Sequence, residues 1–166
     1  MTVVIDANAL VALIASEPDG LAVSELIERW TAEKRELHAP ALARYEIANV
    51  LARQHAVGRL STEDVRSGWQ ALEELPITYH ALIDGPAVID VAATLGRRSA
   101  FDAAYVALAR GLNGELWTLD GPLARNAAGQ KLPVRLIESD DEGIQQPATS
   151  DVPTHEPSDQ ERSQSE

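Results

Sequence analysis

Met1-Thr-Val-Val-Ile-Asp6-Ala-Asn8 opens the chain and indicates its fold class. The β-branched run from Val3 to Ile5 predicts a short strand that is buried on both faces. A helix is predicted from Ala9 to Ala15, with Asn8 as its N-cap. Because Asn8 can serve as the cap, Asp6 is left available for another role directly after the strand.

Strands and helices are predicted to alternate along the rest of the chain. Further strands are expected at residues 37–39, 77–79, 116–119 and 134–137. The helices between them are expected at residues 21–35, 40–57, 61–75, 87–95 and 101–110, with a short one after Gly121-Pro122. This alternation predicts a parallel sheet covered by helices on both faces. In such sheets ligands bind beyond the carboxyl ends of the strands, which is where Asp6 and Asp120 fall.

The net charge of −12 is concentrated near the end of the sequence. Residues 138–166 hold nine acidic residues and one basic residue, and their only large aliphatic side chains are Ile144 and Val152. A segment of this composition buries too little apolar surface to offset the entropy lost on ordering. We therefore predict one folded domain at residues 1–138, followed by a disordered acidic tail at residues 139–166.

Composition excludes several classes of protein. The chain has no cysteine, so it contains no disulfide and no thiolate metal site. The first residues lack a signal peptide pattern and no run of ~18 apolar residues occurs, so we expect a cytoplasmic protein without a membrane span. No Gly-x-Gly-x-x-Gly follows the first strand, which disfavours a dinucleotide-binding fold.

Four acidic residues stand out by their positions. Two of them directly follow predicted strands, one lies at the start of a helix and one lies on an inward helix face: Asp6, Asp120, Asp102 and Glu46. Glu46 shares its face with Leu42 and Val50, and a carboxylate that faces the interior is costly unless it is paired or bound to metal. These four side chains are therefore the candidate catalytic and metal-binding residues.

Each acid also has a structural alternative when it is considered singly. Asp6, Asp102 and Asp120 are favoured turn or cap residues, and Glu46 can pair with Arg44 or Arg53. Taken together, however, two charges ~4 Å apart repel by about 4 kcal/mol at an effective dielectric of about 20, so the cluster would need a divalent cation. Oxygen ligands without Cys or a well-spaced His suit Mg²⁺ or Mn²⁺ rather than Zn²⁺.

Four segments of the chain resemble the motifs of a known family. They are Val4-Ile5-Asp6-Ala7-Asn8, Tyr45-Glu46-Ile47-Ala48-Asn49-Val50-Leu51, Phe101-Asp102-Ala103-Ala104-Tyr105-Val106-Ala107-Leu108-Ala109 and Leu116-Trp117-Thr118-Leu119-Asp120. Their order and spacing resemble PIN domains of the VapC toxin branch over about residues 1–137. The resemblance implies a three-layer α/β/α fold with a parallel five-stranded sheet in the order 3-2-1-4-5.

The resemblance also implies an activity and partners. It implies a Mg²⁺- or Mn²⁺-dependent endoribonuclease, a homodimer and a cognate antitoxin of the VapB kind. By position, Asp6, Glu46, Asp102 and Asp120 would bind the metal, and Asn8 and Thr118 would be supporting polar residues. Metal-activated water would attack the phosphorus and leave 5′-phosphate and 3′-hydroxyl ends.

Other residues have weaker claims to function. Arg97 and Arg98 precede Asp102 and either contact the RNA backbone or lie in a solvated loop. The four histidines (His38, His55, His80 and His155) are scattered and are interpreted as bystanders, and packing is expected for the tryptophans (Trp30, Trp69 and Trp117).

Two alternative functions stay open on sequence alone. A haloacid-dehalogenase-type phosphatase also has an Asp after its first strand, but it needs a second acid where this chain has Asn8. The other alternative is an inert PIN fold that only binds a protein partner.

Overall fold

The strand formed by the opening residues lies at the centre of the sheet in the computed structural model, which describes residues 2–82 and 84–138. The strands are β1 (Val3–Ile5), β2 (Leu37–Pro40), β3 (Ile77–His80), β4 (Glu115–Thr118) and β5 (Val134–Leu136). They are all parallel and lie in the order β3-β2-β1-β4-β5, which confirms the predicted sheet. All strand carboxyl ends therefore meet at one edge.

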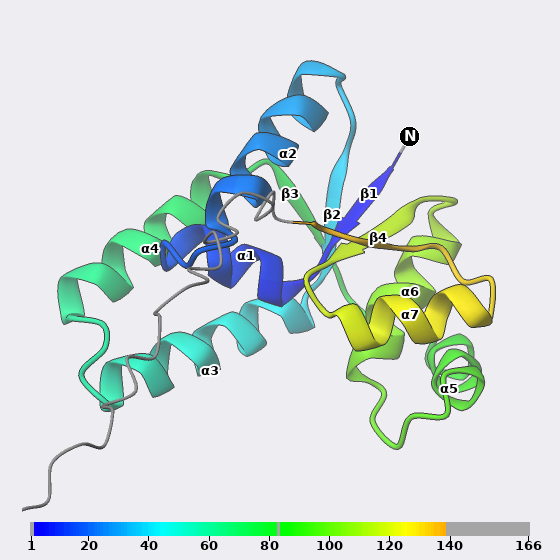
Figure 1. The fold of residues 1–166 in the computed structure, drawn as a ribbon. Helices are drawn as coiled ribbons and strands as arrows, with labels where there is room; N and C mark the ends of the chain where they lie inside the picture. Colours follow the sequence, from blue (N-terminus) through cyan, green and yellow to red (C-terminus); the bar gives the residue numbers. More distant parts are fainter. Residues whose placement is uncertain (1, 83, 139–166) are drawn as a thin grey trace, which may run out of the picture.

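Helices cover both faces of this sheet, as predicted. They are α1 (Ala7–Ile14), α2 (Gly20–Ala32), α3 (Leu42–Ala56), α4 (Thr62–Glu74), α5 (Gly85–Thr94), α6 (Phe101–Gly111) and α7 (Gly121–Gly129). Figure 1 shows α1 to α4 grouped on one side and α5 to α7 on the other. The three-layer α/β/α arrangement is thereby confirmed.

Small aliphatic residues form most of the core, because the chain is poor in aromatic residues. The β1 side chains are fully buried, as expected for a central parallel strand. Trp30 is also buried and meets Trp117 edge to face, with ring centroids 5.2 Å apart. Gly20 lets α2 approach α1 closely, since a Cβ there would lie 2.5 Å from the Ala12 carbonyl oxygen.

Three predicted helix starts are wrong, and one of them is α5, which begins at Gly85 and not at Ala87. The first helix begins at Ala7, so Asp6 occupies the N-cap position and Asn8 is an exposed residue of the first turn. The helix begins early because the extended backbone of Asp6 leads directly from strand to helix. Pro40 ends β2 instead of opening α3; it lies beyond the part of β2 that pairs with β1, where a missing N–H costs no ladder bond.

One predicted helix end is also wrong, since α2 ends at Ala32 and not at Arg35, whereas the predicted start of α4 agrees with the structure. Ser61 caps α4 in a reciprocal capping box with Asp64. Beyond β5, the Ile137 N–H donates to the Thr118 carbonyl at 2.8 Å, so the described chain ends at the carboxyl edge of the sheet. The predicted tail at residues 139–166 lies outside the described residues. Within the described part, no helix has both the length and the apolar character needed to cross a membrane.

Candidate active site

Asp6 is positioned by the pairing of the two central strands. Ile5 is in register with Trp117, and the Asp6 N–H donates to the Trp117 carbonyl at 3.1 Å. The Thr118 hydroxyl donates to Asp6 Oδ2 at 2.5 Å, and it accepts the Asp120 N–H at 2.9 Å. The Thr118 hydroxyl oxygen accepts the bond from the Asp120 N–H, and its single proton is used in the bond to Asp6. Thr118 therefore holds the Asp6 carboxylate, and its supporting role in a reaction stays a prediction.

Burial is the main influence on the pKa of Asp6, because this residue is only 8% exposed. Burial raises the pKa of Asp6 from an ordinary 3.8 to about 6; the Thr118 hydroxyl and the nearby Asn8 N–H oppose this increase, and the Glu46 carboxylate adds to it. Asp6 and Glu46 are thus close enough to repel each other. A carboxylate in this setting gains from a cation that neutralises both charges.

Glu46, which lies on α3, is held by a residue of α6. Its side chain is half-buried on α3, and the hydroxyl of the buried Tyr105 donates to Glu46 Oε2. Burial and the bond to Glu46 raise the pKa of Tyr105 well above its ordinary value, so the hydroxyl stays protonated and remains a donor. The alternative partner Arg44 instead bonds Glu73 at 3.0 Å.

Asp102 and Asp120 have contacts of their own. Asp102 lies in the first turn of α6, on the same face as Tyr105 three residues later, and its carboxylate is 3.6 Å from Arg97 Nε. Asp120 caps α7, with Oδ1 accepting the Leu123 N–H at 2.8 Å. Asp120 thus has the capping role that its sequence context allowed, whereas the N-cap of α6 is Ala100 and not Asp102. Asp102 lies on the helix that carries Tyr105, and Asp120 lies two residues after Thr118.

The structure shows an electrostatic interaction between two of the predicted acids, Asp6 and Glu46. Among residues 2–82 and 84–138, no three His, Asp or Glu side chains are arranged so that they could hold a metal ion together. The four-acid metal site therefore stays a prediction. The Asp6–Glu46 pair nevertheless suits Mg²⁺, which proteins usually bind through one or two carboxylates, with water and substrate phosphate completing the shell.

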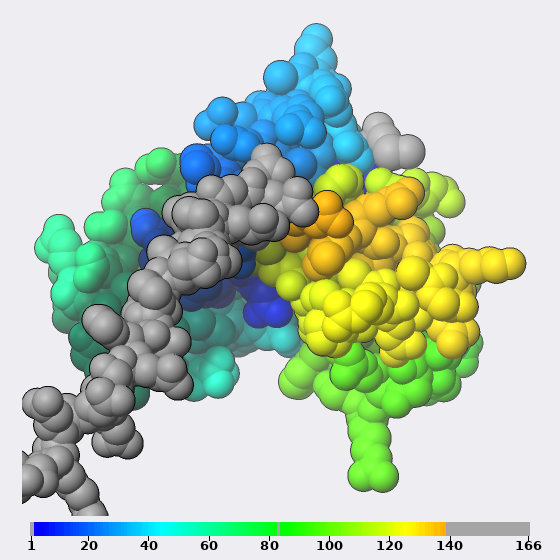
Figure 2. Space-filling model, viewed as in Figure 1, coloured from blue at the N-terminus to red at the C-terminus, as the bar shows by residue number. Residues whose placement is uncertain are grey.

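The acidic edge reaches the surface between two helices. In Figure 2 the dark-blue start of α1 is visible in a recess between the cyan surface of α3 and the yellow surface of α7. Asn8 is exposed in this first turn of α1, and Arg98 is exposed ahead of α6. A polymer could therefore approach this edge from solvent without passing through the core.

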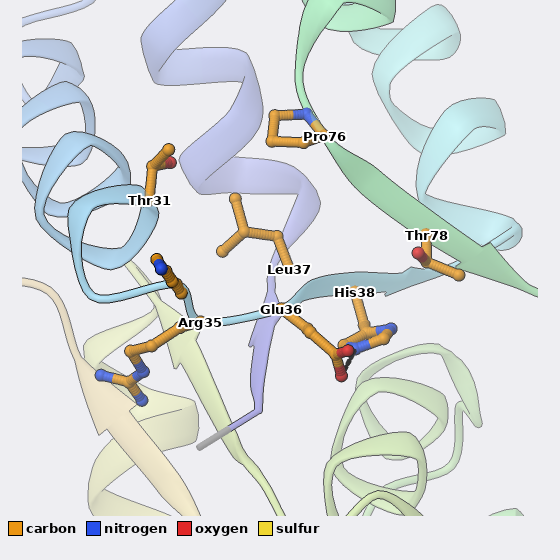
Figure 3. A pocket seen from close by; sticks show the side chains of 8 residues that line it. Thr31, Arg35, Glu36, Leu37, His38, Pro76 and Thr78 are labelled. Carbon is orange, nitrogen blue, oxygen red and sulfur yellow. Dashed lines mark ion pairs between the residues drawn. The ribbon is translucent and has the colours of Figure 1, made fainter.

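A separate cavity of about 340 Å³ lies at the opposite edge, near the amino ends of β2 and β3. Figure 3 shows His38 beside Glu36 there, with His38 Nε2 3.6 Å from the carboxylate. His38 Nδ1 also lies 2.9 Å from His80 Nε2. His38 is in register with Val4 on the neighbouring strand, and His80 is the last residue of β3, at the carboxyl edge of the sheet. The interpretation of these histidines as bystanders stays a prediction.

Tyr105 is the residue of this site that the sequence analysis missed. It lies in the middle of α6, where residues 103–109 are otherwise Ala, Val and Leu, and an aromatic side chain there is easily taken for core. The available signal was its position three residues after Asp102, which directs its hydroxyl to the same face as that acid. A buried Tyr hydroxyl usually has a hydrogen-bond partner, and here the partner is Glu46.

Taken together, these features define an α/β protein with an acidic site at the carboxyl edge of a parallel sheet. The PIN domain family model matches residues 3–129. The chain therefore belongs to the PIN domain family. Ribonuclease VapC3 of Pyrobaculum aerophilum is 37% identical over 132 residues, covering 75% of this chain and 93% of that protein. Ribonuclease VapC9 of Mycobacterium tuberculosis (strain ATCC 25618 / H37Rv) is 33% identical over 129 residues, covering 77% and 93%. These relatives place the chain in the VapC branch of the family.

Solved structures share the fold. The crystal structure of PAE2754 from Pyrobaculum aerophilum superposes with a TM-score of 0.59 at 24% identity, covering 76% of this chain and 79% of that chain. The structure of VapBC2 from Rickettsia felis, bound to a DNA fragment from their promoter, gives a TM-score of 0.63 at 14% identity, covering 83% and 100%. With the family assigned, the phosphatase alternative loses its basis.

Proposed function

We propose that this protein is a Mg²⁺-dependent endoribonuclease and the toxin component of a VapBC-type toxin–antitoxin module. The observation that carries the proposal is the Asp6–Glu46 pair, two mutually repelling carboxylates held by Thr118 and Tyr105 at the carboxyl edge of the sheet. The relatives named ribonucleases support RNA as the substrate. Mn²⁺ would substitute for Mg²⁺ at an all-oxygen site.

The residues of this chain would have distinct tasks in the reaction. Asp6 and Glu46 would hold the cation, which would lower the pKa of a water molecule and stabilise charge on the scissile phosphate. Thr118 keeps the Asp6 carboxylate in place. Asp102 and Asp120 would approach the same centre from α6 and α7 once the cation reduces the repulsion. Asn8 would supply a polar contact from the exposed first turn of α1, and Arg97 and Arg98 would contact the RNA backbone.

The partners follow from the family. We propose a cognate VapB-like antitoxin encoded as a separate chain, and the VapBC2 structure from Rickettsia felis, which shares the fold, supports this proposal. We propose a homodimer from the family resemblance alone. The chain is proposed to act in the cytoplasm.

RNA cleavage by the purified protein tests this function. Incubation of total RNA with protein and Mg²⁺ should give discrete fragments with 5′-phosphate and 3′-hydroxyl ends. Cleavage should stop with EDTA, return with Mg²⁺ or Mn²⁺, and be lost in Asp6→Asn. Cleavage that persists in EDTA, or fragments with 2′,3′-cyclic phosphate ends, would contradict the proposed chemistry.

Calorimetry distinguishes the enzyme from a PIN fold that only binds a protein. A nuclease of this kind should take up Mn²⁺, and Asp6→Asn should reduce that uptake. A folded wild-type protein that takes up no Mn²⁺ and cleaves no RNA would favour the binding module.

A further inference from the structure

We infer that Tyr105 is a positioning residue of the cation site: its hydroxyl fixes the Glu46 carboxylate beside Asp6, so that the two acids meet a cation in one arrangement. The inference rests on the proposed function. Tyr105 would act on the cation site by orienting Glu46, and it would not contact the substrate.

The contact joins two elements that are far apart in the sequence. Tyr105 lies on α6 and Glu46 on α3, and the two residues are 59 positions apart. Tyr105 is 3% exposed, so its ring is fixed by the core while its hydroxyl reaches Glu46 Oε2. A donor on a rigid buried ring restricts a flexible Glu side chain more than a donor on a surface residue would.

Electrostatics also favour this arrangement. The carboxylates of Asp6 and Glu46 both act on the Tyr105 hydroxyl, so the tyrosine lies in the field of both acids. A neutral hydroxyl donates a hydrogen bond without adding a positive charge, so it orients Glu46 and leaves the negative charge of the site available to a cation. An Arg at this position would instead compete with the metal.

The site thus has two hydroxyl–carboxylate pairs of similar design. Thr118 donates to Asp6 from β4, and Tyr105 donates to Glu46 from α6. Outer partners that orient metal ligands typically change metal affinity or activity by about 10–100-fold when they are removed. Tyr105 should therefore matter on the scale of a supporting residue and less than the acids themselves.

The experiment measures Mn²⁺ affinity by calorimetry in wild-type protein, Tyr105→Phe, Glu46→Gln and the double variant. Phe keeps the buried ring and removes only the hydroxyl. We expect Tyr105→Phe to weaken Mn²⁺ binding by at least about 10-fold. In the Glu46→Gln background the same change should have little further effect, because the tyrosine acts through Glu46.

Tyr79→Phe is the matched control. The Tyr79 hydroxyl is also buried, but it has no hydrogen-bond partner among the residues that the structure describes. Its removal should leave Mn²⁺ affinity unchanged. RNA cleavage provides a second readout. Tyr105→Phe should lower kcat at limiting Mg²⁺, and kcat should return to the wild-type value at high Mg²⁺. The KM for RNA should stay nearly unchanged.

Three results would overturn the inference. They are wild-type Mn²⁺ affinity in a folded Tyr105→Phe variant, an equal loss of affinity in the Glu46→Gln background, and an equal loss in Tyr79→Phe. If the wild-type protein itself neither binds Mn²⁺ nor cleaves RNA, the proposed function fails and the inference fails with it. Far-ultraviolet circular dichroism of each variant establishes that it is folded.

Discussion

Replacing Asp6 by Asn should make the metal-free protein more stable at neutral pH. The pKa of Asp6 is about 6 in the folded protein, against an ordinary 3.8, which is a difference of about two units. At 1.36 kcal/mol per unit, ionisation of Asp6 costs the folded state about 3 kcal/mol. The side-chain amide of the Asp6→Asn variant carries no charge at any pH and therefore avoids this cost.

The sign follows from proton binding. Below pH 3.8 the carboxyl is protonated in both states, and ionisation costs nothing. Between pH 3.8 and 6 the folded protein retains the proton that the unfolded chain has lost, so stability decreases as pH rises. Above pH 6 the cost approaches its full value as Asp6 ionises in the folded protein. The stability difference between Asp6→Asn and wild type should therefore change by about 2.5 kcal/mol between about pH 4 and about pH 7.5.

Urea unfolding in EDTA, followed by circular dichroism at several pH values, measures this difference. Asp90→Asn is the control, because Asp90 is an exposed acid on α5 and its replacement should change stability little at any pH. A pH-independent difference between Asp6→Asn and wild type would refute the reasoning, and so would a larger gain for the variant at the acidic end of the range than at neutral pH.

Further outcomes follow from other contacts. Thr118→Val should destabilise the protein by about 1.5–3 kcal/mol in urea unfolding and lower RNA cleavage by about 10–100-fold, whereas Thr118→Ser, which keeps the hydroxyl, should retain most of the stability and most of the cleavage. Gly20→Ala should cost about 1–3 kcal/mol because its Cβ would meet the Ala12 carbonyl, whereas Gly111→Ala, with open space around it, should not destabilise; equal effects would contradict the close packing of α1 and α2. Added Mg²⁺ should raise the melting temperature more at about pH 7.5 than at about pH 4.5, where Asp6 is protonated, and an equal shift at both would count against the acid pair.

Much of the fold was predictable because it depends on patterns that the sequence carries locally. The buried β-branched run at Val3 to Ile5 and the alternation of strands and helices predicted the parallel sheet, and the structure confirms its order. Helix starts were harder to predict, because a cap depends on the backbone conformation of one residue. Asn8 has a good capping side chain, yet the chain turns into the helix two residues earlier, at Asp6.

The candidate site was predictable only for residues whose type is unusual at their position in the sequence pattern. Asp6 and Glu46 were identified as acids that a buried strand and an inward helix face leave without a structural purpose, and the structure brings them together. The Tyr105–Glu46 contact depends on the packing of α6 against the rest of the fold, which local pattern does not encode. The metal-binding roles of Asp102 and Asp120 stay predictions.

The direction in which the chain leaves the sheet has a practical consequence for attaching this protein to a surface or a reporter. The chain enters β1 at the amino edge, whereas Ile137, bonded to the Thr118 carbonyl, leaves β5 at the edge that carries the acids. A fusion partner that replaced residues 139–166 would begin two residues after Ile137, which is bonded to Thr118, and Thr118 in turn bonds Asp6. A label or anchor placed at the amino end instead starts on the far side of the sheet and leaves the acidic recess facing the solution.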